Sequence, residues 1–525
     1  GPIPPQIANI DTLEELVLED NLLGGPLPPN LGNSKSLKRL LLSANNFTGV
    51  IPDTFGNLKN LTDFRIDGSQ LSGKIPEFIG NWTSITRLDL QGTSMEGPIP
   101  ATISLLTKLT ELRISDLSGS NSDFPDLSGM TQMARLVLRN CSITGLILDY
   151  IGDMKALKLL DLSFNSLTGI IPENFQSFSQ SSANLDFMFL TNNLLTGAVP
   201  DWIRSSKKNM DLSYNNFSGP ISVGCQQQEV NLVSGFSSSE NNEISWCLKK
   251  DLTCSGKPQH HSLFINCGGE KMNFENNDYD EDLNPGGASA FISVAEKWAF
   301  SSTGLFLGDD SADFLAGNNF NLSVTSPEFY TSARLAPQSL KYYGLCMRQG
   351  SYKVRLHFAE IMYTDNQTFS SLGRRIFDVS IQGNVVLSNF NIMEKAGGPG
   401  IGIVEEFDNV MVNGTTLEIH FYWTGKGTTA VPDRGVYGPL ISAITVTPNF
   451  EVDDGGGLSA GAIAGIVAAS LVLVVLILII LRLKGYLGGR EPEDQELRGL
   501  DLQTGYFTLR QIKHATNNFD ASNKI

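Results

Sequence analysis

Apolar residues recur along the first 220 residues with a period of 24. The pattern Leu-x-x-Leu-x-Leu starts at seven positions, each 24 residues after the last, and an eighth start follows 28 residues later. The eight starts are Leu13, Leu37, Leu61, Ile85, Leu109, Met133, Leu157 and Leu185. One turn of this length cannot bury its own leucine face, so successive turns must stack and share a core. The pattern predicts a solenoid over residues 1–222.

One position in each turn is mostly small and polar. It lies eight residues beyond each start and is occupied by Asn21, Asn45, Ser69, Thr93, Leu117, Cys141, Asn165 and Asn193, with Asn215 in a shortened last turn. A side chain at this bend must satisfy buried backbone groups, which explains the preference for Asn, Ser and Thr. Cys141 is therefore predicted to be buried and unpaired.

Charged residues alternate in sign on the predicted concave face. Residues between the strand leucines point away from the core, and one such column reads Glu15, Arg39, Asp63, Arg87, Glu111, Arg135. Neighbouring strands lie about 4.8 Å apart, so this column either forms a self-neutralising ladder or leaves guanidinium groups free to bind a ligand carboxylate. The candidate ligand contacts are Arg65, Arg87, Arg113, Arg135 and Arg139, with Phe187 and Phe189 at the apolar end of the face.

A different pattern follows the solenoid. Residues 223–261 are a polar linker with three cysteines, Cys225, Cys247 and Cys254. Residues 262–448 then show short runs with a period of two, separated by Gly and Asn turns, such as YKVRLHFAEI and TTLEIHFYW. This pattern predicts an antiparallel β-sandwich, so the fold class is multi-domain and dominated by β-structure.

Residues 458–481 are uncharged and apolar throughout, after a short linker at 449–457. This stretch is long enough to cross a bilayer, and Arg482, Lys484 and Arg490 after it place the C-terminal segment 482–525 in the cytosol. We expect a single-pass type I protein of the plasma membrane with its N-terminal part outside. Gly461 and Gly465 form a small-xxx-small pair that is one route to a homodimer or a co-receptor contact.

Charge and cysteine use narrow the function further. The net charge is −17, which argues against a nucleic-acid partner. Eight Asn-x-Ser/Thr sequons all precede the apolar stretch, at Asn46, Asn60, Asn81, Asn140, Asn216, Asn321, Asn366 and Asn413. Together with the cysteines they favour an exterior location and predict N-glycosylation. None of the five histidines has metal-ligand spacing. The Gly-rich runs at 397–402 and 424–429 lack a P-loop pattern. We therefore expect no catalytic residue, metal or cofactor in this chain.

Two family resemblances connect these patterns. Turns ending in TGVIP, SGKIP or TGIIP resemble plant-type leucine-rich repeats, and LFINCGGE, YTSARLAPQSLKYYGL and RRIFDVSIQG resemble a malectin domain. Malectin-type domains are similar to carbohydrate-binding jelly rolls, which implies glycan contacts unless the tyrosines merely pack. The implied glycan-binding residues are Tyr330, Tyr342, Tyr343, Tyr363 and Asp433. Cys267 and Cys346 are candidates to pair within this domain. Cys225, Cys247 and Cys254 are further disulfide candidates, and the odd thiol among them stays unassigned.

The end of the chain completes the picture. YFTLRQIKHATNNFDASNKI resembles the segment before the kinase domain of plant leucine-rich-repeat receptor-like serine/threonine kinases. The resemblance implies a fragment that lacks its N-terminal cap and its kinase, so ATP and Mg are expected only for the missing kinase. Such a receptor senses an extracellular peptide or carbohydrate. The alternative is a kinase-less, membrane-anchored module, either a decoy, a co-receptor or a cell-wall glycan binder.

Overall fold

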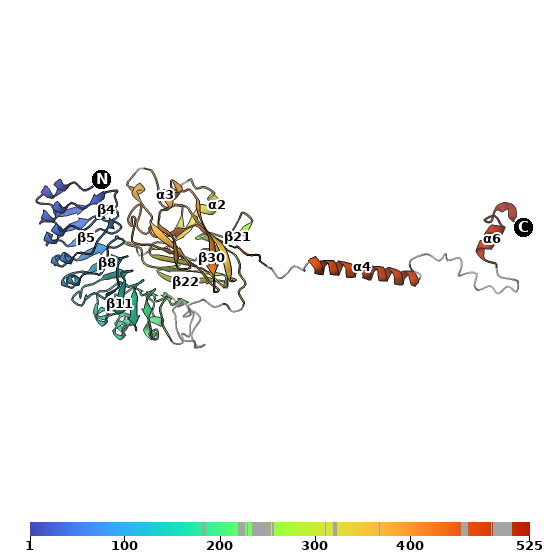
Figure 1. The fold of residues 1–525 in the computed structure, drawn as a ribbon, viewed down its shortest axis with the longest axis horizontal. Helices are drawn as coiled ribbons and strands as arrows, with labels where there is room; N and C mark the ends of the chain where they lie inside the picture. Colours follow the sequence, from blue (N-terminus) through green and yellow to red (C-terminus); the bar gives the residue numbers. More distant parts are fainter. Residues whose placement is uncertain are drawn as a thin grey trace. The chain divides into compact units, whose positions relative to one another are not determined.

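The computed structural model divides the chain into two compact units, residues 1–451 and residues 452–525. It describes residues 1–180, 184–218, 226–227, 229–233, 254, 257–309, 311–318, 323–366, 368–452, 460–484, 486 and 507–524. Figure 1 shows the stacked turns of the solenoid in blue to green and the sandwich in yellow to orange. The predicted combination of solenoid, sandwich and one long apolar helix is confirmed.

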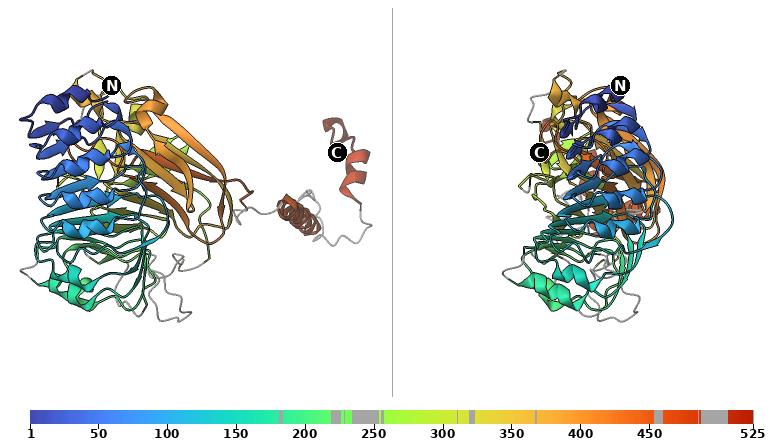
Figure 2. Two further views of the ribbon diagram at one scale, coloured as in Figure 1. Left: turned by 60° about the vertical axis from the view of Figure 1, so that its left-hand side comes forward. Right: turned by 90° about the vertical axis from the view of Figure 1, so that its left-hand side faces the viewer.

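The solenoid carries a parallel sheet on its concave side, in which each turn contributes one short strand. Figure 2 shows these turns stacked from the N-terminus downward. Only the last pair, β17 with β18, is antiparallel. In sheet order the described strands are β1 (Glu15–Val17), β3 (Arg39–Leu41), β5 (Asp63–Arg65), β7 (Arg87–Leu90), β8 (Glu111–Ser115), β10 (Arg135–Arg139), β12 (Leu159–Asp161), β14 (Phe187–Phe189), β16 (Asn209–Asp211), β18 (Val230–Asn231) and β17 (Gln226–Gln227).

Two smaller parallel sheets run beside the concave sheet. They contain β2 (Gly24–Pro26), β4 (Asn46–Gly49) and β6 (Gln70–Leu71), and then β9 (Ser122–Asp123), β11 (Ile143–Leu146), β13 (Ser166–Gly169) and β15 (Leu194–Leu195). Most turns then close with a short helix, and in most of these the proline of Gly-x-Ile-Pro occupies the N-cap and fixes the backbone φ at the helix start. These helices are η1 (Pro5–Asn9), η2 (Pro29–Asn33), η3 (Asp53–Asn57), η4 (Glu77–Asn81), η5 (Ala101–Leu105), η6 (Asp149–Asp153), η7 (Glu173–Ser179) and α1 (Asp201–Arg204). The fifth turn has no helix among its residues.

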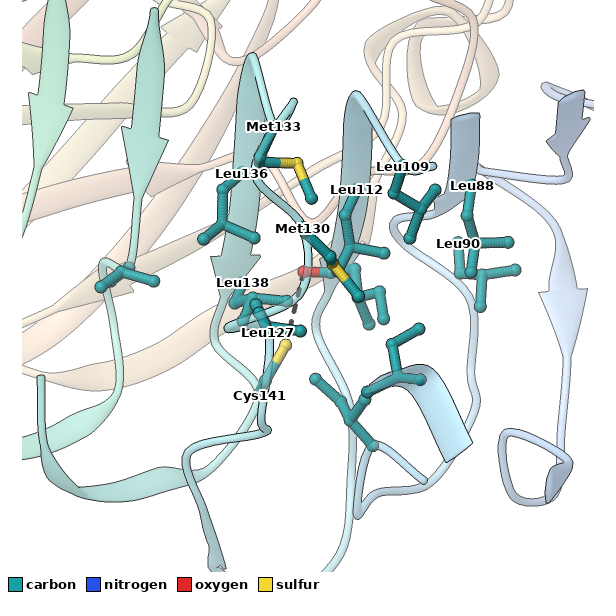
Figure 3. Packing of buried hydrophobic residues seen from close by; sticks show 14 of the residues in the cluster. Leu88, Leu90, Leu109, Leu112, Leu127, Met130, Met133, Leu136, Leu138 and Cys141 are labelled. Atoms are coloured by element: carbon teal, nitrogen blue, oxygen red, sulfur yellow. Dashed lines mark hydrogen bonds between the residues drawn. The ribbon is translucent and has the colours of Figure 1, made fainter. Parts of the chain in front are cut away.

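The asparagine column satisfies the backbone at the bend after each strand, as predicted. Asn45 Nδ2 donates to the carbonyl oxygens of Leu18, Leu42 and Ser43, and its Oδ1 accepts from the Leu23 N–H at 3.0 Å. Asn165, Asn193 and Asn215 repeat this arrangement in later turns. Cys141 is buried and unpaired in the same column, and its thiol donates to the Ile114 carbonyl at 3.4 Å (Figure 3). Burial raises the pKa of this thiol well above its ordinary value, so it is inert.

The fifth turn has SGSNSDFPDLSGM in place of the Gly-x-Ile-Pro motif, yet it keeps the core continuous. Leu127 and Met130 are fully buried there and pack near Met133 and Leu112 (Figure 3). The Tyr150 hydroxyl accepts from the Leu127 N–H at 3.0 Å and donates to the Pro125 carbonyl. The lost Gly-x-Ile-Pro motif is therefore replaced by local packing.

The sandwich has two six-stranded sheets and a small third one. Strands pair antiparallel, except that β19 and β21 are parallel. The first sheet is β20 (Met272–Phe274), β21 (Asn277–Asp282), β19 (Leu263–Cys267), β33 (Ala443–Pro448), β27 (Gly350–Phe358) and β30 (Ile403–Val412). The second is β22 (Ser289–Val294), β23 (Trp298–Thr303), β26 (Ser339–Gly344), β31 (Leu417–Tyr422), β28 (Phe377–Ile381) and β29 (Asn384–Phe390). The third is β24 (Leu315–Gly317), β25 (Ser332–Leu335) and β32 (Leu440–Ile441), and the helices are α2 (Pro327–Tyr330), η9 (Phe369–Leu372) and α3 (Ile392–Ala396).

The cysteine pairing differs from the expected one. Cys346 forms a disulfide with Cys254 of the linker, so the expected bond between Cys267 and Cys346 is wrong. Cys267 is a free, fully buried thiol on β19, and burial raises its pKa well above its ordinary value. Cys225 and Cys247 lie outside the described residues.

The second unit contains the apolar helix. It is α4 (Ala460–Leu483), and its segment Gly461–Leu483, in which an 18-residue window has a mean hydropathy of 3.3, is long and apolar enough to cross a membrane. The predicted span of 458–481 ends two residues earlier, and its first two residues lie outside the described part. Near the end of the chain, α6 (Leu509–Ala515) begins with a capping box between Thr508 and Gln511, and η11 (Ala521–Asn523) follows.

Candidate functional site

The sandwich packs against the concave face of the solenoid. Gln338, just before β26, donates to Asp161 Oδ2 at 3.0 Å, and Thr303 at the end of β23 donates to Asp211 Oδ2 at 2.5 Å. Tyr214 donates to Glu418 Oε2 at 2.6 Å. Each bond joins the solenoid to the sandwich, and the two lie in one compact unit.

Glycines permit the closest approach between the two. The loop after β31 lies against the bends of two solenoid turns, where a Cβ on Gly92 would lie 2.2 Å from the Gly425 carbonyl carbon. A Cβ on Gly68 would lie 2.9 Å from the Gly427 carbonyl oxygen. This Gly-rich run, which has no P-loop pattern, is therefore part of the contact between solenoid and sandwich.

The charge ladder forms in the predicted register. Glu15, Arg39, Asp63, Arg87, Glu111 and Arg135 face one another across successive strands. Arg135 lies 2.7 Å from Glu111, Arg87 lies 3.3 Å from Glu111, and Arg65 lies 2.7 Å from Asp63 in its own strand. The ladder thus pairs its own charges to a large extent, while ligand binding by Arg65, Arg87, Arg113 and Arg135 stays a prediction.

Two other predicted solenoid contacts are buried, and a third is half-buried. Arg139 is fully buried, 3.2 Å from Asp116 and 3.2 Å from the Trp423 carbonyl oxygen, so the hypothesis that it is an open guanidinium is wrong. Burial opposes its charge, but Tyr422 and Asp116 raise its pKa. Phe189 is fully buried beside Ala288 of the sandwich, so its predicted role as an open peptide contact is wrong. Phe187 packs against the same cluster but is half-buried, and its role as a peptide contact stays a prediction.

The tyrosines predicted to stack on sugars are core residues. Tyr330, Tyr342, Tyr343 and Tyr363 are all buried. Tyr342 donates to Asp282, Tyr343 bonds to Tyr214 across the domain contact, and Tyr330 contacts His357. Tyr363 lies against the guanidinium of Arg375, 4.9 Å from its ring centre, and burial raises its pKa to about 12. Their predicted role in glycan stacking is wrong, because stacking requires an accessible ring face.

The remaining predicted residues lie on the surface. Asp433 is exposed, on the loop before β32. Among the sequons, Asn60, Asn81, Asn140, Asn366 and Asn413 are exposed, Asn46 and Asn216 are half-buried, and Asn321 lies outside the described residues. Asn46 also accepts a hydrogen bond from Arg374 of the sandwich. Glycosylation itself stays a prediction.

A cavity of about 230 Å³ remains between the charge ladder and the sandwich. Its solenoid wall is charged, and includes Asp20, Arg65, Asp67, Asp89, Glu111 and Arg113. Its sandwich wall is largely apolar, and includes Leu305, Phe306, Leu307, Trp423, Ala430 and Tyr437. This cavity is the candidate functional site, because charged and apolar groups from two domains converge there.

At the end of the cavity formed by the first turns of the solenoid, burial raises the pKa of the acidic side chains. Desolvation raises the pKa of Asp20 to about 6, with Glu19 adding to the effect and Arg374 opposing it. Desolvation and the neighbouring Asp89 raise the pKa of Asp67 well above its ordinary value. At the other end, burial opposes the charge of Glu111, but Arg87, Arg113 and Arg135 lower its pKa. Burial lowers the pKa of Arg113.

Several residues of the contact escaped the sequence analysis, although a signal for some of them was present. The motif Leu-Asp-Leu recurs at 88–90 and 160–162, and Met-Asp-Leu at 210–212. It places Asp89 in the cavity wall, and Asp161 and Asp211 under polar groups of the sandwich. Leu305, Phe306 and Tyr437 carry no such repeat, so nothing in their sequence context marks them as lining residues.

The described residues contain no group of three or more His, Cys, Asp or Glu side chains arranged to hold a metal ion.

A second cavity, of about 450 Å³, lies between Phe164 and Tyr214 of the solenoid and His420 and Tyr422 of β31. Desolvation lowers the pKa of His420 well below its ordinary value, so this imidazole is neutral.

Family models match both parts of the ectodomain. The malectin domain model matches residues 261–444, and the leucine rich repeat model matches residues 36–58 and 156–178. A probable leucine-rich-repeat receptor-like serine/threonine-protein kinase of Arabidopsis thaliana is 61% identical over 393 residues, which are 74% of this chain and 38% of that relative. Another relative of the same description and organism is 44% identical, over 74% of this chain and 39% of its own length. The chain spans about two-fifths of the length of these relatives.

Solved structures resemble part of the chain. The ectodomain of the Arabidopsis receptor kinase HAESA, in complex with an N-terminally extended IDA peptide hormone ligand, is 29% identical. It covers 44% of this chain and 39% of its own, with a TM-score of 0.41. At that score the likeness carries no inference about a ligand of this chain.

Proposed function

We propose that this chain, whose ectodomain belongs with those of the plant leucine-rich-repeat receptor-like serine/threonine kinases that carry a malectin domain, is the sensing and membrane-anchoring part of such a receptor. The observation that carries the proposal is the 61% identity to a receptor-like kinase over 74% of the chain. The apolar helix Gly461–Leu483 supports a single-pass protein with its repeats outside the cell. The plasma membrane is the proposed location.

The domain contact supports sensing at the junction of solenoid and sandwich. The sandwich covers much of the concave face, including Arg139 and Phe189, so a ligand cannot lie along the whole sheet. The cavity of about 230 Å³ keeps arginines and carboxylates of the ladder accessible. A ligand bound there touches both domains and therefore shifts the equilibrium between arrangements that differ in this contact.

The cytosolic half of the function belongs to a domain beyond this chain. The proposed kinase uses ATP and Mg to phosphorylate Ser or Thr of a protein substrate. Helix association through Gly461 and Gly465, with a second copy or a co-receptor, is the proposed link between ectodomain and kinase.

The transcript beyond the codon for Ile525 tests the proposal directly. An open frame that enters a Gly-rich loop, a strand Lys and the catalytic-loop Asp supports a receptor kinase, and the expressed full-length protein should autophosphorylate in the presence of ATP and Mg. A stop codon at this point contradicts the kinase and leaves a membrane-anchored binding module.

The orientation is tested separately by glycosylation. Treatment of the membrane-inserted chain with peptide N-glycosidase should lower its apparent mass, and replacement of the exposed Asn60 and Asn366 by Gln should reduce that shift. An unchanged mass would contradict an exterior location of the repeats.

A further inference from the structure

The charges of the cavity between solenoid and sandwich are separated into two poles. At one pole lie three carboxylates, Glu19, Asp20 and Asp67. Arg65 lies 3.7 Å from Glu19 but 2.7 Å from Asp63, so Asp63 takes its shorter ion pair. Among the described residues neither Asp20 nor Asp67 forms an ion pair, and Asp67 accepts a hydrogen bond from Ser43. Arg374 of the sandwich offsets part of the charge of Asp20, and a further cation bound at this acidic pole would stabilise the charged form of its carboxyl groups.

The opposite pole has an excess of arginines. Arg87, Arg113 and Arg135 all pair with Glu111, at 3.3, 3.7 and 2.7 Å. Asp89 neutralises part of this charge, since it lies 3.5 Å from Arg87. The basic pole therefore sets three guanidinium groups against two carboxylates, which favours an additional carboxylate.

Two buried polar atoms in the cavity wall form no hydrogen bond with any of the described residues. Gln91 is 3% exposed, and its Oε1 accepts no hydrogen bond from any described residue. Arg113 is 6% exposed, and its Nε donates none. Both residues line the cavity. A buried polar atom without a hydrogen bond is unfavourable, so the wall is suited to a polar ligand.

The cavity also offers an apolar surface and a route from solvent. Leu305, Phe306 and Tyr437 of the sandwich line the wall opposite the ladder. Arg87 and Arg135 keep 27% and 35% of their side-chain surface exposed, so the basic pole is reachable. Asp67 follows β5 and Arg113 lies on β8, two strands away, which is a separation of roughly 10 Å across the sheet.

We propose that this cavity binds a short zwitterionic peptide, with its ammonium group at the acidic pole of Glu19, Asp20 and Asp67 and its carboxylate at the basic pole of Arg87, Arg113 and Arg135. An extended tripeptide spans roughly 10 Å and matches the separation of the poles. A central apolar side chain packs against Leu305 and Phe306. The inference rests on the proposed function, since it names the ligand class of that sensing site.

The pKa values in the cavity agree with this polarity. Desolvation raises the pKa of Asp67 and of Glu19, which means that their charges lack compensation in the unliganded chain. Desolvation lowers the pKa of Arg113. A bound ammonium and carboxylate would restore the charged form on each side.

Calorimetry on the full 525-residue chain in lipid nanodiscs at low salt tests the proposal. The probe is glycyl-leucyl-glycine in four forms: with free termini, N-acetylated, C-amidated and with both caps. We expect the free peptide to bind and each single cap to weaken binding about tenfold or more, because each removes one charge-assisted contact. No binding of the free peptide, or equal binding of all four forms, would overturn the proposal.

Substitutions at each pole test which end of the peptide that pole binds. Asp67→Asn should abolish the difference between free and N-acetylated peptide, and Arg113→Gln the difference between free and C-amidated peptide. Arg39→Gln is the matched control, because Arg39 belongs to the same ladder but pairs with Glu15 outside the cavity and should leave all four affinities unchanged. Retained differences in both pole variants would overturn the assignment, and the four peptide forms decide the matter if a variant does not fold.

This experiment is independent of the test of the receptor itself. An open kinase frame with no peptide binding would overturn only the ligand class. A stop codon after Ile525 with charge-dependent peptide binding would overturn the kinase and retain the site.

Discussion

At the residue scale, the sandwich core holds a buried ion pair with complete hydrogen bonding on its acidic side. Arg334 lies 2.7 Å from Asp282 through both Nε and Nη2, and the two side chains are 0% and 1% exposed. Tyr342 also donates to Asp282. A buried charge is tolerated here because each partner compensates the other.

Loss of one partner should therefore be costly. Arg334→Met is expected to lower the free energy of unfolding by about 3–5 kcal/mol, since it leaves Asp282 buried without its counter-charge. Lys353→Met, at an exposed ion pair with Asp408, should have a far smaller effect, because solvent screens that pair. Denaturant unfolding of both variants measures the difference, and equal effects would contradict the role of burial.

The buried carboxyl of Asp20 predicts a pH dependence. Desolvation raises its pKa from 3.8 to about 6, so the folded chain binds a proton that the unfolded chain releases. The stability that this proton provides is fully present below about pH 3.8 and is lost as the pH rises through about 6.

Asp20→Asn should remove this dependence. The variant is expected to be more stable than the parent by about 1 kcal/mol at pH 7.5 and nearly equal at pH 4, after allowance for the partial exposure of the site. Thermal unfolding between these pH values provides the measurement, with the exposed Asp11→Asn as the control. A constant difference at every pH would contradict the assignment to Asp20.

At the element scale, the asparagine column links successive turns of the solenoid. Asn165 donates to the carbonyl oxygens of Leu138 and Leu162 at 2.7 and 3.0 Å, and accepts from the N–H groups of Cys141 and Ile143. It therefore satisfies backbone groups in two turns. Asn21, at the N-terminal end of the column, donates only to Leu18 and Glu19 of its own turn.

This difference predicts unequal costs along one column. Asn165→Ala should lower the free energy of unfolding by about 3 kcal/mol, because several buried backbone groups lose their partner. Asn21→Ala should cost about 1 kcal/mol, because its bonds lie within one turn and fewer backbone groups lose a partner. Hydrogen exchange of the turns around residue 165 locates the loss, and a larger effect at Asn21 would refute the inter-turn role.

At the scale of the whole molecule, the contact between solenoid and sandwich depends on the absence of side chains. Gly92 and Gly425 both have positive φ values, and a Cβ on Gly92 would collide with the Gly425 backbone. Gly145 also has a positive φ, but a Cβ there would meet nothing within 4 Å. A comparison of Gly92 with Gly145 therefore distinguishes the effect of backbone strain from the effect of steric collision.

Gly92→Ala should open the domain contact, whereas Gly145→Ala should not. Both variants incur the cost of a positive φ, but only the first places an atom inside the neighbouring domain. Small-angle scattering should show a larger radius of gyration for Gly92→Ala, and proteolysis should cleave it faster. An unchanged radius for Gly92→Ala would show that the contact adjusts around the added methyl group.

The sequence by itself determined the features that repeat locally. The period of 24 set the strand positions, the asparagine column and the register of the charge ladder, because each turn meets its neighbour at a constant separation along the chain. The apolar stretch likewise determined the long helix by composition alone. Family resemblance supplied the malectin domain, but not which of its tyrosines stay accessible.

Only the tertiary structure decided which part of the concave face stays open. Arg139 and Trp423 are 284 residues apart, and no period relates them. The disulfide is a second such case. Cys346 pairs with Cys254 of the linker and not with Cys267, the partner expected within the domain. Burial of Tyr363 and closure of the cavity depend on such long-range contacts, because a side chain is accessible or covered only in relation to the surface that packs on it.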